Sequence, residues 1–327
     1  MLSNHPLVLY RYKATLVINY KDCAMLNVIW ATDIGCEKDW EVDYIKELLD
    51  KIGVPYNLVT ASRMDEVFPN ALIVTNHSVS YMDMFHLYEL SETPFGVIHL
   101  SDEWFSDDVS FYDFSMCKFA WRNYYDERFD IHPKLNYLAL SYKLGFWNGY
   151  NGKSPRDITY ANREYAWSFA GAPRTNERMA TLQMFKDAVL PNKVHFEMGN
   201  SFCKPETGLD TKAYRALLLN TQFGLCAVGI SKTLSGDTCR VTETLETGGI
   251  PIVLAGYNSK NVSYWKSLYN EDPPFIIGNT WEECLKKVNK LIEDPQECER
   301  VRLACCDFWQ TYKSRISNTL GYHIQYI

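Results

Sequence analysis

The sequence predicts an α/β protein made of two doubly wound units in tandem, and three observations lead to this prediction. The chain has 327 residues, which is long for one compact domain and sufficient for two. Short apolar runs of strand length alternate with segments of helical periodicity, the pattern of parallel sheets with crossover helices. The alternation breaks once, in the polar segment 145–156 with its glycines and proline, and then resumes. We therefore expect one unit before this segment and one after it.

The elements of the first unit follow from the positions of the apolar residues. Continuous apolar runs predict buried strands, and apolar residues three and four positions apart predict helices. The first helix is expected to end at Gly53, because glycine readily adopts the left-handed conformation that closes a helix. The predicted strands are Leu26–Thr32, Tyr56–Thr60, Ala71–Thr75 and Phe95–Leu100, and the predicted helices are Val42–Ile52 and Met82–Leu90.

The second unit repeats this alternation. Its predicted strands are Tyr165–Phe169, Lys193–Phe196, Phe223–Ala227 and Ile250–Leu254, and its predicted helices are Asn176–Ala188, Thr211–Asn220, Asp237–Thr247, Trp281–Glu293 and Pro295–Trp309. Ligands of doubly wound units bind beyond the carboxyl ends of the parallel strands. We therefore expect the binding site in a cleft where the two units face each other.

Composition excludes several classes of protein. The net charge is −7 and the pI is near 5.6, whereas binding along a nucleic-acid backbone needs a concentrated basic field. No segment approaches the roughly 18 consecutive apolar residues of a membrane span, and the N-terminus lacks the pattern of a signal peptide. Ten cysteines without a C-x-x-C pair argue against a zinc site or a disulfide scaffold. The sequence therefore predicts a cytoplasmic protein that has no transmembrane segment and does not bind nucleic acid.

The most informative segment, 223–254, predicts a strand, a loop, a helix and a second strand. Gly229 and Ser235 lie in the loop, and Asp237 or Thr238 is placed to cap the helix. Such a loop presents free backbone N–H groups, and the helix start carries a partial positive charge, so a phosphate group is favoured there. We therefore predict that these four residues contact a phosphorylated ligand.

Two charged residues follow on the same helix. Arg240 lies in its first turn, where a guanidinium can hold a diphosphate, and Glu243 lies one turn deeper, where a carboxylate can accept ribose hydroxyls. A plain β-α-β unit with a solvated arginine and glutamate would have the same spacing, and that alternative stays open. The segment has neither the P-loop nor the Rossmann glycine pattern, so the sequence does not support a kinase or a dehydrogenase.

The same segment resembles the signature of the exostosin-like glycosyltransferases (family 47). That signature consists of F-x-L-C-P-x-G at a strand end, D-T-x-R-x-x-E at a helix start and G-x-I-P-V at the next strand. The residues that stand at these places are Phe223, Leu225, Cys226, Gly229, Asp237, Thr238, Arg240, Glu243, Gly249, Ile250 and Pro251. Ala227 replaces the family's proline, and the loop after Gly229 is longer.

Segment 167–178 carries a second part of the resemblance. It is similar to the family's F-x-G strand end, which is followed by a basic helix entry. In the family this loop lies over the donor, so the resemblance makes Gly171, Arg174 and Arg178 candidates for contact with the diphosphate. Taken alone, the segment predicts only a strand, a turn and a helix with surface arginines.

The resemblance implies the GT-B fold, in which two Rossmann-like doubly wound domains face a central cleft. It assigns residues 1–150 to the acceptor domain and 156–308 to the nucleotide-sugar domain, with a last helix, 309–327, that crosses back. The implied reaction is inverting transfer from a UDP-sugar to a hydroxyl of a glycan acceptor, without a metal or other cofactor. UDP-xylose is the first expectation, and galactose, glucuronic acid and N-acetylglucosamine donors stay open, as does the oligomeric state.

Two alternatives from other classes stay open beside the enzyme. One is a catalytically silent GT-B-like carbohydrate-binding or scaffold subunit, and the other is a two-lobed protein that binds a small ligand. Turnover of the donor separates the enzyme from both.

Inverting transfer needs a base that removes the proton of the acceptor hydroxyl. Asp102 and Glu103 follow the strand that ends near Leu100, so they are predicted at the cleft, with Asp102 the first choice. Adjacent residues of an extended backbone point in opposite directions, so at most one of the two faces the acceptor. Asp33 and His77 are further candidates. Each carboxylate is equally compatible with a loop residue that caps a helix.

Overall fold

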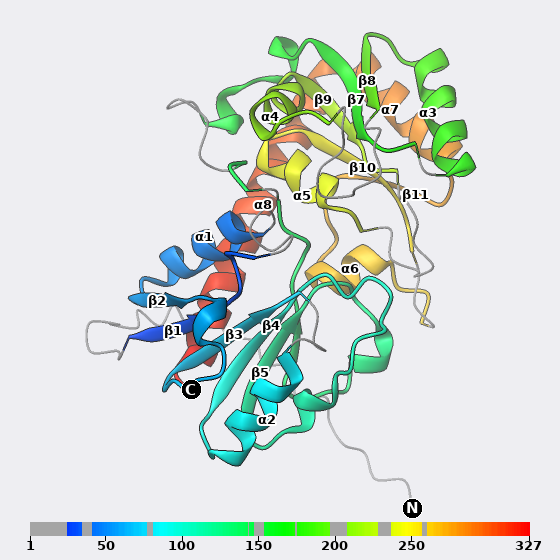
Figure 1. The fold of residues 1–327 in the computed structure, drawn as a ribbon. Coiled ribbons are helices and arrows are strands. Elements are labelled where there is room, and N and C mark those ends of the chain that lie inside the picture. Colours follow the sequence, from blue (N-terminus) through cyan, green and yellow to red (C-terminus); the bar gives the residue numbers. More distant parts are fainter. Residues whose placement is uncertain are drawn as a thin grey trace, which may run out of the picture.

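The structure is a computed structural model that describes residues 25–34, 41–76, 81–142, 144–146, 154–173, 175–196, 208–227, 237–256 and 260–327. Within these residues the strands form two separate parallel sheets, and helices connect successive strands (Figure 1). We call the described residues up to 146 the N-terminal half and those from 154 to 293 the C-terminal half. A long last helix follows.

The sheet of the N-terminal half has the strand order β2-β1-β3-β4-β5-β6, and all of its pairings are parallel. Its elements are β1 (Leu26–Ile29), α1 (Val42–Ile52), β2 (Tyr56–Val59), β3 (Ala71–Thr75), α2 (Met82–Leu90), β4 (Phe95–His99), β5 (Cys117–Arg122) and β6 (Leu135–Tyr137). Short 3₁₀ helices occupy 61–63, 110–113 and 127–129.

The sheet of the C-terminal half has the order β11-β10-β9-β7-β8 and is also parallel. Its elements are β7 (Tyr165–Gly171), α3 (Asn176–Ala188), β8 (Asn192–Phe196), α4 (Thr211–Leu219), β9 (Thr221–Leu225), α5 (Cys239–Glu246), β10 (Ile250–Leu254), α6 (Tyr264–Tyr269), β11 (Ile276–Gly278) and α7 (Trp281–Glu293). Two 3₁₀ helices, 155–157 and 160–162, precede β7, and α8 (Pro295–Ile324) ends the chain.

Strand β3 shows why the apolar runs of the N-terminal half are continuous rather than alternating. All five of its residues are buried. Leu72 and Val74 join the core that contains α1, whereas Ala71 and Ile73 join the core that contains α2. Because a helix covers each face of the sheet, neither face of this strand meets solvent. The two parallel sheets confirm the predicted α/β class with two doubly wound units in the GT-B arrangement.

Helix α5 is held unusually close to β9, which matters for the site described below. A Cβ atom on Gly224 of β9 would lie 2.1 Å from the Thr244 hydroxyl oxygen of α5, so only glycine fits at this position. Thr238 caps the helix by accepting a hydrogen bond from the Arg240 N–H at 3.1 Å. The start of α5 is therefore fixed beside the carboxyl ends of the central strands.

Helix α8 is one continuous helix to Ile324, whereas the apolar pattern predicted a helix that ends at Trp309 and the resemblance implied a separate last helix, 309–327. It begins in the C-terminal half and runs along α1 of the N-terminal half (Figure 1). The Tyr312 hydroxyl accepts a hydrogen bond from the Ala139 N–H at 2.7 Å, and Trp121 Nε1 donates one to His323 Nδ1 at 3.2 Å. Within the described residues, no helix combines the length and the apolar composition that crossing a bilayer requires.

A buried ion triad joins the two halves through α8. The ammonium of Lys313 lies 2.7 Å from Glu47 Oε1 of α1 and 2.8 Å from Glu246 Oε2 of α5. Trp309 Nε1 and the Tyr142 hydroxyl also donate hydrogen bonds, to Glu246 and Glu47 respectively. Burial raises the pKa of the Glu246 carboxyl. Burial also acts to raise the pKa of Glu47, but the charge and hydrogen bond of Lys313, the hydrogen bond of Tyr142 and the charge of Lys51 together hold it below the ordinary value.

Replacing Lys313 by methionine should destabilise the protein strongly. The change leaves the buried Glu246 carboxylate without its cation and leaves Glu47 with Lys51 alone, at 3.1 Å. Breaking a buried pair in this way costs about 3–5 kcal/mol of unfolding free energy. Lys266→Met is the matched control, because Lys266 forms an exposed pair with Asp272 that is worth about 1 kcal/mol or less. Urea unfolding of both variants measures the difference. Equal effects would show that the triad does not hold the halves together.

Candidate functional site

Two arginines that the sequence assigned to the diphosphate lie side by side at the carboxyl ends of β7 and β9. Arg178 donates hydrogen bonds from Nη1 to Ala172 O at 2.6 Å and from Nη2 to Ala227 O at 3.0 Å. Arg240 donates from Nε to Ala170 O at 3.1 Å and from Nη1 to Ala227 O at 3.3 Å. The carbonyl oxygen of Ala227 thus binds both guanidinium groups, although the arginines come from different helices.

An aromatic ring and a glycine complete this arrangement. The Phe169 ring faces both guanidinium carbons, with its centroid 4.7 Å from Arg240 Cζ and 5.4 Å from Arg178 Cζ. At Gly171 the backbone φ is +152°, and a Cβ atom would lie 2.7 Å from Arg240 Nη2. Gly171 therefore leaves room for the Arg240 side chain. Phe169 is the phenylalanine of the F-x-G strand end and was not among the predicted site residues, although its position two residues before Gly171 places it on the same face of the strand.

The pair of guanidiniums is a candidate anion site because of its charge. Within the described residues no carboxylate forms an ion pair with Arg240, whose neighbours are carbonyl oxygens and a threonine hydroxyl. The side chain of Arg240 is only partly buried, whereas Arg178 is 5% exposed. Two adjacent cations repel each other unless an anion lies between or beside them, and a diphosphate provides that charge.

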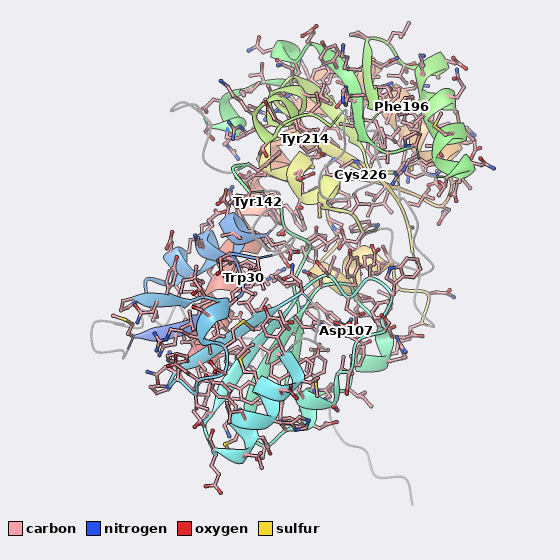
Figure 2. All side chains as sticks on the ribbon, viewed as in Figure 1. Trp30, Asp107, Tyr142, Phe196, Tyr214 and Cys226 are labelled. Atoms are coloured by element: carbon pink, nitrogen blue, oxygen red, sulfur yellow. The ribbon has the colours of Figure 1, made fainter. Side chains whose placement is uncertain are left out.

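Glu243, the residue expected to bind ribose, is buried one turn below the start of α5. Its side chain is 3% exposed, and its Oε2 accepts a hydrogen bond of 2.8 Å from the Tyr214 hydroxyl of α4. Burial and the Glu243 charge together raise the pKa of Tyr214 well above its ordinary value, so this phenol stays protonated and continues to donate. Figure 2 shows Tyr214 within the C-terminal half.

Asp237 lies immediately before the cap of α5 and is 5% exposed. Neither of its carboxylate oxygens has a hydrogen-bond partner. The N–H groups of Thr238 and Leu140 point toward the carboxylate without reaching hydrogen-bond geometry, and burial raises its pKa to about 7. Leu140 belongs to the N-terminal half, so Asp237 lies where the two halves meet.

Asp102, the first choice for the base, is bound on both of its oxygens. Arg122 Nη2 donates to Oδ2 at 3.0 Å, and the N–H groups of Ser106 and Asp107 lie 2.9 and 3.4 Å from Oδ1. Arg122 ends β5, is fully buried and lies against the rings of two phenylalanines. Asp102 thus closes its own loop onto the neighbouring strand.

Glu103 of the N-terminal half and Asp237 at the start of α5 act electrostatically on the same phenol. This phenol is Tyr124, which follows β5 and has a φ of 57°. Burial raises the pKa of the Tyr124 phenol first, and the thiol of Cys239 and the carboxylates of Glu103 and Asp237 raise it further. Charges from both halves therefore act on one phenol. A positive φ in a bulky residue stores backbone strain, which is common where a site is built.

One group of residues in the described part of the chain has donors close enough to hold a metal ion. The ligand atoms of His99, Asp102 and Asp107 all lie within 4.8 Å of one another. They are already paired, since His99 Nε2 lies 2.8 Å from Asp107 Oδ2 and Nδ1 lies 2.7 Å from the Tyr112 hydroxyl. The guanidinium of Arg122 binds the third ligand, Asp102. A cation beside this arginine is disfavoured by charge, so the cluster fits a hydrogen-bonded network better than a metal site.

Figure 2 shows Asp107 at the edge of the N-terminal half that lies below α6. The other candidates fall elsewhere. Asp33 is exposed, and its Oδ1 accepts a hydrogen bond of 3.2 Å from the Ala61 N–H. Arg174, Gly229, Ser235 and His77 lie outside the described residues. The structure brings together Gly171, Arg178 and Arg240 at the end of β7 and places Asp237 and Thr238 at the start of α5.

The fold defines an α/β protein of the GT-B type, glycosyltransferase-like in architecture, with two adjacent arginines at the carboxyl ends of strands of the C-terminal sheet. The profile of the family described as the RXYLT1 C-terminal domain matches residues 150–325. The match covers more than half of the chain, so the protein belongs to this family. A comparison with curated protein sequences gives no significant match. Membership of exostosin family 47 itself stays a prediction from the motif.

Several solved structures are similar to this chain over most of its length. The T4 phage BGT in complex with UDP and Mn²⁺ has 9% sequence identity and a TM-score of 0.47, over 92% of this chain and 99% of that one. The pneumococcal O-GlcNAc transferase GtfA in complex with UDP and GlcNAc has 11% identity and a TM-score of 0.46, over 79% and 57%. The Candida albicans trehalose-6-phosphate phosphatase N-terminal domain has 10% identity and a TM-score of 0.47, over 86% and 74%. At these values we take nothing about function from them.

Proposed function

We propose that the protein is a metal-independent, inverting glycosyltransferase that uses a UDP-sugar donor, with UDP-xylose the first candidate. The observation that carries the proposal is the convergence of Arg178 and Arg240 on one carbonyl oxygen beside the capped start of α5. Membership of the family described as the RXYLT1 C-terminal domain supports a xylosyl donor. The acceptor is a hydroxyl group of a glycan.

The arginines provide the charge that the leaving group requires. As the bond between the sugar C1 and the β-phosphate oxygen breaks, its electron pair moves to the diphosphate, which gains negative charge. Two fixed guanidiniums and the N-terminal dipole of α5 stabilise that charge without rearranging. The same work is done by a divalent cation in other transferases, so a site with two arginines can function without one.

We propose Glu103 as the base and Asp102 as the residue that positions its loop. An acceptor hydroxyl attacks C1 from the face opposite the diphosphate, and its proton passes to the Glu103 carboxylate as the new glycosidic bond forms. Asp102 already accepts hydrogen bonds from Arg122 and from backbone N–H groups, so its oxygens are less available. Glu103 comes from the N-terminal half and acts on the same phenol as the residues at the start of α5.

Arg240→Ala should weaken the binding of UDP about ten- to a hundredfold, because a charge-assisted contact is worth roughly 1.5–3 kcal/mol. Arg300→Ala is the control, since Arg300 pairs with Glu297 on the exposed side of α8. Isothermal titration calorimetry with UDP measures both. Parent-like binding of UDP by the Arg240 variant would remove the arginine pair as the diphosphate site.

Substitutions of Asp102 and Glu103, which follow β4, should differ in their effects on melting temperature and turnover. Glu103→Gln should keep the parent's melting temperature and UDP affinity, while its turnover falls by about 10²–10⁴-fold. Asp102→Asn should instead lower the melting temperature, because the buried Arg122 loses its charged partner. UDP release from UDP-xylose with a panel of glycan acceptors measures turnover.

The opposite pattern, a stable but inactive Asp102→Asn and an active Glu103→Gln, would make Asp102 the base. A parent protein that binds UDP-sugars and releases no UDP with any acceptor of the panel would instead be the catalytically silent binding subunit.

Activity should survive EDTA, because no step of the proposed reaction uses a metal ion. The assay is UDP release before and after chelation, with added manganese as the third condition. Complete loss with EDTA that manganese restores would overturn the metal-free mechanism.

A further inference from the structure

The carboxylate of Asp237 is the most anomalous polar group in the described part of the chain. It is 5% exposed, and neither oxygen accepts a hydrogen bond. Burying a charged or polar group without partners is costly, so such a group calls for a missing partner or a function. Asp237 lies three residues before Arg240 and directly before the capping residue of α5. It is therefore next to the proposed diphosphate site without being part of it.

Aromatic rings and a thiol surround Asp237. Charged groups act on the same rings and thiol, among them the carboxylates of Glu41 and Glu103 and the guanidiniums of Arg122 and Arg240. The negative charge of Asp237 contributes to the raised pKa values of groups on three elements and one loop, each of which burial raises first. These groups are Tyr124 after β5, Cys239 at the start of α5, Tyr264 and Tyr269 of α6, and Tyr312 of α8. No cation of the described residues is among the groups that act on Asp237, whose pKa is set by burial and two backbone N–H groups.

A second unpartnered group lies in the same place. The hydroxyl of Tyr269 is buried and has no hydrogen-bond partner, and the Asp237 charge is the strongest influence on its pKa after burial. The hydroxyl of Ser141 is also buried without a partner, and Ser141 follows Leu140, whose N–H points toward the Asp237 carboxylate. An acceptor and two hydroxyls without partners suit a ligand that carries several hydroxyl groups.

We propose that Asp237 accepts hydrogen bonds from hydroxyl groups of the donor's sugar and restricts the donor to a neutral sugar. This inference rests on the proposed function, because the diphosphate must bind at the arginines for the sugar to lie beside Asp237. A sugar attached to the β-phosphate extends from the diphosphate by one glycosidic bond, and Asp237 lies three residues before Arg240, directly ahead of the capping residue Thr238. A uronic acid brings a second carboxylate beside Asp237 with no cation to compensate it.

UDP-xylose and UDP-glucuronic acid form a matched pair for the test, because they differ only in the carboxylate at C5 of the sugar. The parent should bind UDP-xylose at least tenfold more tightly than UDP-glucuronic acid. In Asp237→Asn the affinity for UDP-xylose should fall about ten- to a hundredfold, the affinity for UDP should stay unchanged, and the preference over UDP-glucuronic acid should shrink. Asp272→Asn is the control, since Asp272 is exposed and pairs with Lys266.

The parent protein alone provides a second measurement that does not depend on a variant. Asp237 must be ionised to accept hydrogen bonds on both oxygens, and its pKa in the unliganded protein is about 7. Hydroxyl donors favour the ionised form, so the affinity for UDP-xylose should rise from pH 6 to pH 8 and level off above that. The affinity of Asp237→Asn should show no such rise. The phenols and the thiol around Asp237 have raised pKa values, so they stay neutral in this range.

The outcomes separate this inference from the proposed function. A parent that binds UDP, with UDP-xylose affinity unchanged by Asp237→Asn and independent of pH, overturns the inference and leaves the proposed function standing. That result would mean that buried water satisfies Asp237. A parent that prefers UDP-glucuronic acid also overturns it. A parent that binds neither UDP nor any UDP-sugar overturns the proposed function itself.

Discussion

The buried ammonium of Lys313 fixes the relation between the two sheets on which the site depends. Its two carboxylate partners, Glu47 and Glu246, belong to α1 of one half and α5 of the other. Glu246 is the last residue of α5, and Arg240 lies in the first turn of the same short helix. Anchoring one end of α5 to the N-terminal half therefore also sets where its other end meets that half. Because a buried charge without its partner costs several kcal/mol, the triad strongly disfavours any sliding of α5 against α1.

Local apolar pattern predicted most of the elements, and tertiary contacts explain where it failed. Helices α1, α2, α3 and α7 and strands β3 and β10 have the bounds that the sequence predicted. The apolar pattern predicted a helix only as far as Trp309, and the further helix over 309–327 came from the resemblance alone. This last stretch includes the polar residues Lys313 and Ser317. The structure buries both of these, since α8 lies between two halves and is covered on more than one face. Strand β5 was missed because Lys118 and Arg122 interrupt its apolar run. Partners distant in sequence decide these features.

From the sequence, Arg178 and Arg240 were assigned to one site, and Asp102 was placed before Glu103 as the base. Arg178 and Arg240 follow strands that end at the same edge of a parallel sheet, so topology alone brings them together. The sequence could not predict that the carbonyl oxygen of Ala227 binds both arginines, because that contact depends on the path of the loop. Alternation along the chain predicted that only one of Asp102 and Glu103 faces the junction. Which of them is tied down depends on Arg122, the last residue of the strand that the sequence did not reveal.

Two residues near the start of α5 carry charges of opposite sign. In the proposed complex the positive Arg240 binds the diphosphate, and the negative Asp237 binds the neutral sugar. The guanidinium of Arg240 forms hydrogen bonds with carbonyl oxygens and, within the described residues, no ion pair with a carboxylate. The carboxylate of Asp237, three residues earlier, is buried without a hydrogen-bond partner. Without a ligand, both charges are unfavourable. The guanidinium of Arg240 is repelled by that of Arg178, and the carboxylate of Asp237 is buried away from water. Each becomes favourable with a ligand that is negative at one end and rich in neutral hydroxyl groups at the other. In the proposed complex, only a ligand that carries both a diphosphate and a neutral sugar stabilises both positions.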